Sequence, residues 1–240
     1  MASEHHILSA FDRDLEAILA QIMKMGGLVE AAILDAATAL EARDVELAEK
    51  VRAGDKRIDA LEEKINQEAA RVLALRSPAA TDLRTVLTVM KIAANLERMG
   101  DYAKNMGKRV PALAETPAIG GTGGALKRMA KAVGIMLKDA LDAYVARDAE
   151  KAEDVRQRDR EVDQMYNALF RELLTHMLED PRNITACMHL HFIAKNVERM
   201  GDHVTAIAEQ VIYLVKGALP EEGRPKGDET SYMRPGAGQG

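Results

Sequence analysis

One seven-residue pattern occurs twice in this chain, as NLERMGD at residues 95–101 and as NVERMGD at residues 196–202. A second match lies upstream in each half, where the triplet Ala-Arg-Asp ends at Asp44 and again at Asp148. Self-similarity over so long a stretch indicates that one structural unit is present in two tandem copies. This duplication constrains the fold more than any other feature, because both copies must fold in the same way.

Each unit is predicted to be helical. Hydrophobic residues make up 47% of the sequence and charged residues 30%, but aromatic residues make up only 3%, and strong helix formers dominate. Apolar residues recur with helical spacing, as at Ile18, Ile22 and Met25. No alternating strand pattern competes, so we predict an all-α protein of two similar three-helix bundles.

Polar and Gly- or Pro-containing segments set the expected boundaries. Asp44 is a candidate helix N-cap, and Ser77-Pro78 and Asp180-Pro181 each suggest an N-cap followed by proline in the first helical position. Gly26-Gly27 suggests a kink in the first helix. The predicted organisation is a first bundle over 1–112, a Gly-rich linker over 113–124, a second bundle over 125–217, and a disordered tail over 218–240.

Several classes of protein are disfavoured. The net charge of −5 argues against a nucleic-acid partner. The single cysteine, Cys187, cannot form an internal disulfide and fits a reducing compartment. No basic, apolar leader is evident at the start, and no uninterrupted apolar run reaches the ~18 residues of a membrane-spanning helix. We therefore expect a cytoplasmic protein without membrane insertion.

The repeated motif carries two acidic residues four positions apart. Glu97 and Asp101 therefore share one helix face, as do Glu198 and Asp202. The apolar stripe of the same helix leads into this face, which places the acids beside the packed seam. Gly100 lies between the first pair, where a missing side chain permits close approach by a backbone or ligand.

The second helix of each copy carries a matching pair of acids. Neighbouring helices in a bundle lie ~8–10 Å apart, so four carboxylates can face one another in each copy. Oxygen ligands favour hard divalent or trivalent cations such as magnesium, manganese or calcium, and iron or zinc are further possibilities. The candidate metal ligands are Asp55, Asp59, Glu97, Asp101, Asp159, Asp163, Glu198 and Asp202.

Two other interpretations of these acids stay open. Acid pairs are common on the solvated faces of charged helices. Alternatively, Arg98 and Arg199 can pair with neighbouring acids, so that the motif is a structural ion network. An enzyme is not expected, because the chain has no Glu-x-x-His di-iron pattern, no phosphate loop and no nucleophile–base arrangement.

The chain resembles the PhoU family from about Phe11 to Lys216. The resemblance rests on Leu28-Val29-Glu30, Asp55-x-x-x-Asp59, Asp82-Leu83-Arg84, and both copies of the repeated motif, which continue as Asp101-Tyr-Ala and Asp202-His203. It implies two similar three-helix bundles that often form dimers, and metal clusters bound through paired acids.

The family resemblance also implies a function. Such a protein restrains the phosphate-starvation response, acting between the ATPase subunit of the phosphate ABC transporter and a membrane sensor histidine kinase, and is not an enzyme. One departure concerns the residue four positions after the motif aspartate, which is Asn105 in the first copy but Ala206 in the second. We therefore expect the two sites to differ in ligands or occupancy.

Overall fold

The computed structural model describes residues 2–78 and 80–221, with side chains from Phe11 onward. Most of the tail predicted to be disordered therefore lies outside the described residues. Within the described part, the structure consists of helices and turns. The elements are α1 (Ala2–Ala42), α2 (Val45–Arg76), α3 (Thr81–Gly107), α4 (Val110–Ala114), α5 (Thr122–Ala146), α6 (Ala149–Glu179), the 3₁₀ turn η1 (Pro181–Asn183) and α7 (Ile184–Lys216).

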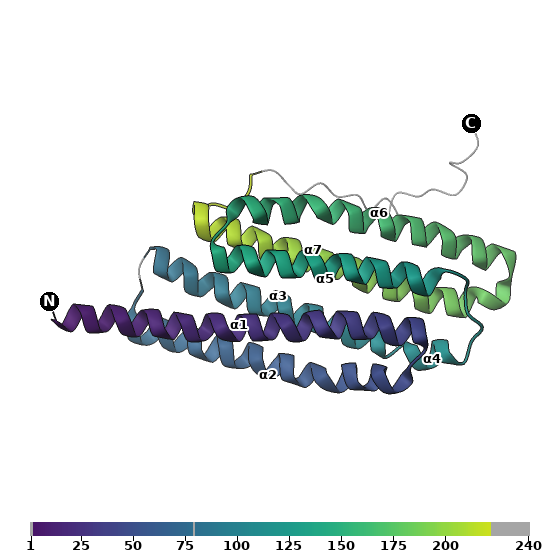
Figure 1. Ribbon diagram of the computed structural model, residues 1–240, viewed down its shortest axis with the longest axis horizontal. Helices are drawn as coiled ribbons and strands as arrows, with labels where there is room; N and C mark the ends of the chain where they lie inside the picture. The colour runs from purple at the N-terminus through teal and green to yellow at the C-terminus, as the bar shows by residue number, and fades with distance from the viewer. Residues whose placement is uncertain (1, 79, 222–240) are drawn as a thin grey trace.

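Six long helices form two adjoining bundles, α1–α3 and α5–α7, that lie side by side along one long axis (Figure 1). Within each bundle every helix packs against the other two, and the bundles meet mainly through α3 against α7 and α1 against α5. The bundles run in opposite directions, because the α2–α3 turn and the α6–α7 turn lie at opposite ends of the molecule. The prediction of two similar three-helix bundles is confirmed.

The core follows the helical periodicity of the sequence. Along α1, Ile18, Ile22 and Met25 are at most 1% exposed. A Cβ atom at Gly26 would lie 2.2 Å from Leu141 Cδ1 on α5. The helix continues unbroken through Gly26 and Gly27, so Gly26 is explained by the close approach of the second bundle rather than by the expected kink.

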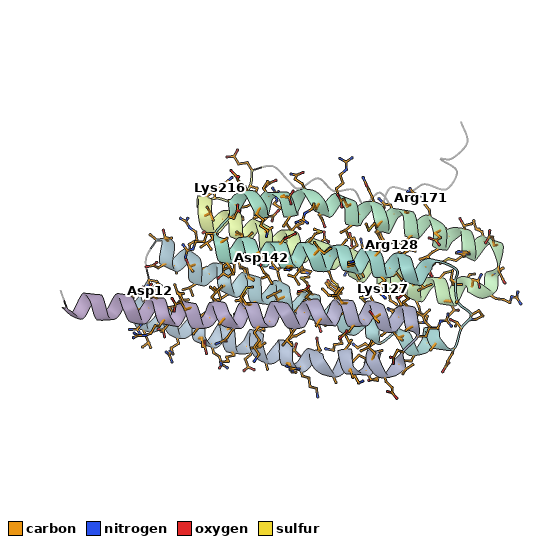
Figure 2. All side chains as sticks on the ribbon, in the orientation of Figure 1. Asp12, Lys127, Arg128, Asp142, Arg171 and Lys216 are labelled. Atoms are coloured by element: carbon orange, nitrogen blue, oxygen red, sulfur yellow. The ribbon has the colours of Figure 1, made fainter. Side chains whose placement is uncertain are left out.

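Charged side chains occupy the outer faces. Figure 2 labels Asp12 on α1, Arg171 on α6 and Lys216 at the end of α7, and all three are exposed. Fully buried apolar residues line the interior of both halves. Acidic residues that are buried in the interior therefore need a specific explanation.

Helix termini confirm some of the predicted boundaries and correct others. Asp44 caps α2 by accepting a hydrogen bond from the Leu47 backbone nitrogen at 2.9 Å. Asp180 likewise caps η1, with Pro181 in its first position. The prediction for Ser77 was wrong: it ends α2 in a left-handed conformation with φ of 43°, and α3 begins only at Thr81.

The segment between the bundles is more ordered than a Gly-rich linker suggests. The short helix α4 spans the predicted boundary between residues 112 and 113, and α5 already begins at Thr122. The hydroxyl of Thr122 donates to the Ile119 carbonyl at 2.8 Å, within the turn that precedes α5. This local side chain–backbone bond helps to fix the end of the segment that was predicted as a Gly-rich linker.

Helix α1 is long and apolar enough over Phe11–Ala42 to cross a membrane, judged by length and composition alone. Charged residues such as Lys24 and Glu30 interrupt this segment, so it contains no uninterrupted apolar run of the kind expected for a membrane-spanning helix. Core helices of soluble proteins pass the same test, and α1 packs against α2, α3 and α5 in this structure. The apolar stripe of α1 therefore packs against the other helices of the protein.

Candidate functional site

The four predicted acids of the first bundle belong to one electrostatic cluster between α2 and α3. Asp55 is 3% exposed, whereas Asp59 is exposed and Glu97 and Asp101 are half-buried. Burial raises the pKa of Glu97, and the neighbouring charges of Asp101, Glu62 and Asp59 raise it further, while Arg98 lowers it. Sequence analysis did not include Glu62, which joins the cluster one turn beyond Asp59.

Lys104 supplies positive charge to this first cluster. Its ammonium group forms an ion pair with Asp55 Oδ2 across the helix interface, and lies 3.2 Å from Asp101 Oδ1 on its own helix. The hydrogen bond to Asp55 is the main reason why the pKa of Lys104 is raised above its ordinary value. The other oxygen of Asp55, Oδ1, is buried without a hydrogen-bond partner.

Gly100 brings α2 and α3 together at this cluster. A Cβ atom at this position would lie 3.0 Å from Ile58 Cδ1 and 3.5 Å from Asp55 Oδ1. The glycine therefore permits the close approach that the sequence predicted, and the approaching group is the α2 segment that carries Asp55. This contact places the buried carboxylate next to the repeated motif.

The acids of the second bundle are more deeply buried. Asp159, Asp163 and Glu198 are 2%, 4% and 6% exposed, and Asp202 is half-buried. The two copies also differ in the residue next to the acids: where the first copy has Glu62, the second copy has the buried Tyr166. The same pattern of acids is thus partly solvated in the first copy and more deeply buried in the second.

Gly201 performs the role of Gly100 at closer range. A Cβ atom there would lie 2.7 Å from Asp159 Oδ1, so the α6 carboxylate sits directly against the α7 turn that carries Glu198 and Asp202. Lys195 lies 2.9 Å from Glu198 Oε2 on the same helix. The geometry therefore joins the acids of the two helices at one site, with a basic side chain at its edge.

Arg156 is a second basic group in this bundle, and its side chain is 4% exposed. Its guanidinium contacts Glu153 Oε2 at 2.7 Å and Glu209 Oε1 at 3.3 Å. Glu209 is the acid that follows Ala206 in the second copy. The contact with Arg156 links α6 to α7 about two turns beyond the motif.

The donor set suits a hard cation better in the second bundle than in the first. Carboxylate oxygens are preferred ligands of such ions, and desolvation strengthens their attraction for positive charge. In the first bundle the Lys104 ammonium already occupies the position between the two helices. Among the described residues, no group of three His, Cys, Asp or Glu side chains is arranged to hold a metal ion, so cation binding requires side-chain movement.

The structure shows a further difference between the copies, one residue before Asn105 and Ala206. Asn105 accepts a hydrogen bond from Lys108 Nζ at 3.1 Å. The preceding residue is Lys104 in the first copy, which contacts two of the acids, and the uncharged Thr205 in the second. A comparison of the two copies at the residue before Asn105 and Ala206 would have identified this difference in charge.

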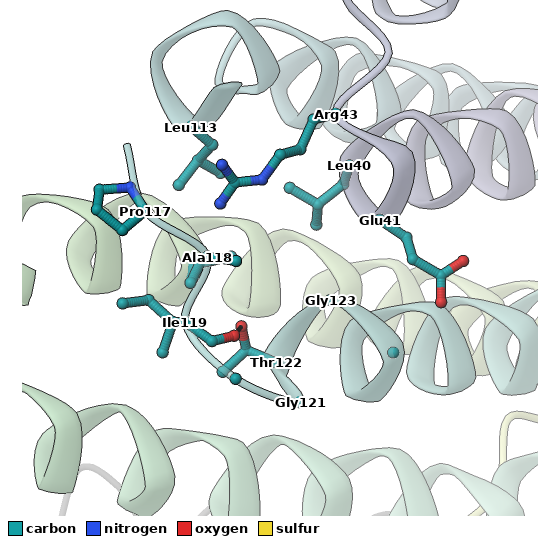
Figure 3. Close-up of a pocket in the computed structure, with 13 residues that line it drawn as sticks. Leu40, Glu41, Arg43, Leu113, Pro117, Ala118, Ile119, Gly121, Thr122 and Gly123 are labelled. Carbon is teal, nitrogen blue, oxygen red and sulfur yellow. Dashed lines mark hydrogen bonds between the residues drawn. The ribbon is translucent and has the colours of Figure 1, made fainter. Parts of the chain in front are cut away.

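One hollow lies away from both acid clusters. It measures about 220 Å³ and lies where the linker crosses the end of α1 (Figure 3). Arg43 points into it and donates to the Thr116 carbonyl, while Lys127 Nζ lies 2.6 Å from Glu41 Oε2 at its rim. Its basic groups already pair with protein oxygens, so the acid clusters are the stronger candidate for a functional site.

The two bundles also meet through polar and aromatic contacts. His203 Nδ1 lies 2.8 Å from Asn95 Oδ1, and its ring lies 5.6 Å from that of Tyr102. Tyr102 and His203 occupy equivalent positions in the two copies and meet each other at the α3–α7 interface. This contact agrees with an approximate two-fold relation between the bundles and satisfies His203 structurally.

Comparison with known proteins identifies both copies. The family described as "PhoU domain" matches residues 22–110 and 126–211. A phosphate-specific transport system accessory protein PhoU homolog from Rhizobium meliloti is 47% identical over 231 residues, covering 96% of this chain and 98% of the relative. The homolog of the same description from Caulobacter vibrioides is 45% identical over 226 residues, covering 94% and 98%.

Solved structures show the same architecture. The crystal structure of PhoU from Pseudomonas aeruginosa has a TM-score of 0.83 and 39% identity, and the match covers 87% of this chain and 100% of that one. The phosphate transport system regulatory protein PhoU from Streptococcus pneumoniae has a TM-score of 0.82 and 32% identity, with 88% and 100% covered.

Proposed function

This chain belongs to the PhoU family, and from that premise we propose that it regulates phosphate homeostasis by restraining the phosphate-starvation response. The match along nearly the whole of both chains carries this proposal, because the relatives that it covers are described as accessory proteins of phosphate-specific transport. The bundle architecture supports it, since long exposed helices offer surfaces for other proteins.

The proposed partners are the ATPase subunit of the phosphate transporter and a membrane sensor histidine kinase. The protein would act in the cytoplasm, where both partners expose their soluble parts, and would form a homodimer. It would act by binding rather than by catalysis, in keeping with a family of accessory proteins. Docking on one partner in rich phosphate would hold the other in its non-signalling state.

Cation binding is the second element of the proposal. The three buried carboxylates Asp159, Asp163 and Glu198 support it, because buried anionic oxygens gain more from a bound cation than solvated ones do. Together with Asp202 they would hold a divalent or trivalent ion between α6 and α7. The ion would supply positive charge that fixes the two helices and the surface that they present.

A metal-free adaptor is the alternative, and the ion pairs favour it. Lys104 contacts two acids of the first cluster, and Lys195 and Arg156 supply positive charge in the second bundle. In that case the acids stabilise the helix interface as an ion network. Family membership is the same for both alternatives, so they differ only in whether the protein binds a cation.

A reporter experiment tests the regulatory role. In cells lacking the gene, a phosphate-starvation reporter should be active even in rich phosphate, and the wild-type gene should repress it. The double variant Glu198→Gln/Asp202→Asn should fail to repress it fully if a bound cation is required. Asp154→Asn, at a carboxylate on α6 that is 66% exposed, is the matched control and should repress normally.

The outcomes separate the parts of the proposal. A reporter that stays repressed in the deletion strain contradicts the regulatory assignment. Full repression by the double variant, with wild-type protein levels, contradicts a required cation at the second cluster and favours the metal-free adaptor.

A further inference from the structure

We propose that Lys104 is a covalently tethered cation that closes the first acid cluster to soluble metal ions, which leaves cation exchange to the second cluster. This inference rests on the cation binding proposed above. It assigns different roles to the two copies of the motif. The first becomes a fixed structural link between α2 and α3, and the second becomes the site that responds to ions.

The position of the Lys104 ammonium group carries the argument. It contacts Asp55 on α2 and Asp101 on α3 at the same time, which is the bridging position that a metal ion would take. Asp55 is 3% exposed, so its charge needs a partner close at hand. The Lys104 side chain is 30% exposed, so it stays partly in contact with solvent while its charge pairs with the buried carboxylate.

Tethering gives the ammonium an advantage over a dissolved ion. An attached group acts at an effective concentration in the millimolar range or above, which exceeds the concentration of most free transition-metal ions. A divalent ion has twice the charge, but it must lose water and displace Lys104 before it reaches Asp55. The remaining acids of this cluster, Asp59 and Glu97, are more exposed and contribute weaker attraction.

Lys104 does not satisfy every buried oxygen that a metal ion could bind in the first cluster. Asp55 Oδ1 is buried without a hydrogen-bond partner, although Oδ2 of the same carboxylate is paired with Lys104. An unsatisfied buried acceptor raises the free energy of the folded state. The structure therefore contains an oxygen that a cation could bind if the lysine were absent.

The second copy provides the natural comparison. Its residue at the equivalent position is Thr205, which carries no charge whichever hydrogen bonds it makes, and its hydroxyl donates to the Asp202 carbonyl at 2.7 Å. Lys104→Thr therefore places the residue of the second copy into the first. The remaining carboxylates of the first cluster are unchanged by this substitution.

The test counts Mn²⁺ ions bound per full-length chain by equilibrium dialysis followed by metal analysis. Lys104→Thr should bind one more Mn²⁺ per chain than the wild type, and adding Asp55→Asn should remove the gain. Lys104→Arg, which keeps a cation, and Lys108→Thr, which removes a nearby lysine outside the acid cluster, should bind as the wild type does. Circular dichroism establishes that each variant is folded.

The result for Lys104→Thr decides the inference separately from the proposed function. No gain over the wild type overturns the inference, as does a wild type that loses an ion when Asp55→Asn is introduced. A wild type without bound Mn²⁺ removes the proposed cation role of the second cluster, but a gain in Lys104→Thr still supports the role of Lys104. If Lys104→Thr does not fold, Lys104→Gln, of similar length, replaces it with the same expectation.

Discussion

At the scale of single residues, the acids could be predicted from the sequence but their counter-charge could not. Helical spacing placed Glu97 and Asp101 on one face, and the duplication singled out the equivalent acids. Helical spacing permits the pair of Lys104 with Asp101, but it does not specify that this long side chain also reaches Asp55 on another helix. Only the packing of α2 against α3 brings it to Asp55.

The glycine of the second motif gives a sharp test of packing. We predict that Gly201→Ala destabilises the protein by about 1–3 kcal/mol, because the new methyl group overpacks the site against Asp159 Oδ1. The measurement is the urea concentration at the midpoint of unfolding, converted with the slope of the transition.

Gly27→Ala is the matched control for that substitution. Gly27 is also in a helix, but a Cβ atom there meets nothing within 4 Å. This change should stabilise the protein by up to about 1 kcal/mol through helix propensity alone. Equal stabilisation by both substitutions would show that α6 does not approach Gly201 closely.

His191 provides a prediction about pH. Its ring lies near those of Tyr166, Phe170 and Phe192 at centroid distances of 6.1, 5.3 and 5.8 Å. Burial lowers the pKa of His191 below its ordinary value, and the charge of Lys195 lowers it further. The unfolded chain therefore binds a proton more readily than the folded chain, and the folded state loses stability as pH falls through the ordinary histidine range.

We therefore expect His191→Phe to reduce the loss of stability between pH 7.5 and pH 5.5, measured as the change in the free energy of unfolding. The Phe ring retains the aromatic contacts and does not titrate. Phe192→Leu, which alters the same cluster without a titratable group, should keep the wild-type pH dependence. An unchanged slope in His191→Phe would contradict the role assigned to this histidine.

At the scale of helices, local chemistry determined which boundaries could be predicted. Asp44 and Asp148 are both N-caps in extended backbone conformations, as expected for acids that precede an apolar periodic segment. Ser77-Pro78 carries the same type of signal, but Ser77 is needed to end the preceding helix. Ser77 ends α2 and does not cap α3, and the sequence alone does not show which of these two roles it takes.

The cap of α6 can be tested directly. Asp148 accepts hydrogen bonds from the backbone nitrogens of Glu150 at 3.0 Å and Lys151 at 2.9 Å. Asp148→Ala should lower the free energy of unfolding by about 1 kcal/mol, because these donors lose their acceptor. Asp148→Asn retains an acceptor and should change it by much less. A comparable loss in both variants would indicate that the effect comes from charge rather than from the cap.

At the scale of the whole molecule, the duplication predicted two bundles but not how they pack together. The repeat specifies the interior of each copy, whereas their shared interface depends on residues that differ between the copies. Gly26 against Leu141 and His203 against Tyr102 are examples. For this reason the sequence suggested a kink at Gly26, and the structure shows contact between the bundles there.

The two copies are also coupled through the packing of α7 against α3. In the first bundle Lys104 pairs with two of the four acids, Asp55 and Asp101, and the equivalent four acids are more deeply buried in the second bundle. A bound ion at the second cluster would fix α6 to α7, and through α7 it would stabilise the contact with α3. Cation binding should therefore stabilise the molecule as a whole and not only one end of it.

The most direct test of cation binding is the melting temperature as a function of Mn²⁺ concentration. An ion that binds only the folded state adds about 2.7 kcal/mol at a hundred times its Kd, which raises the melting temperature of a chain this long by roughly 5–10 °C. We predict this rise for the wild type and Asp154→Asn, and its loss in Glu198→Gln/Asp202→Asn. An equal rise in all three proteins, or none in the wild type, would contradict cation binding at the second cluster.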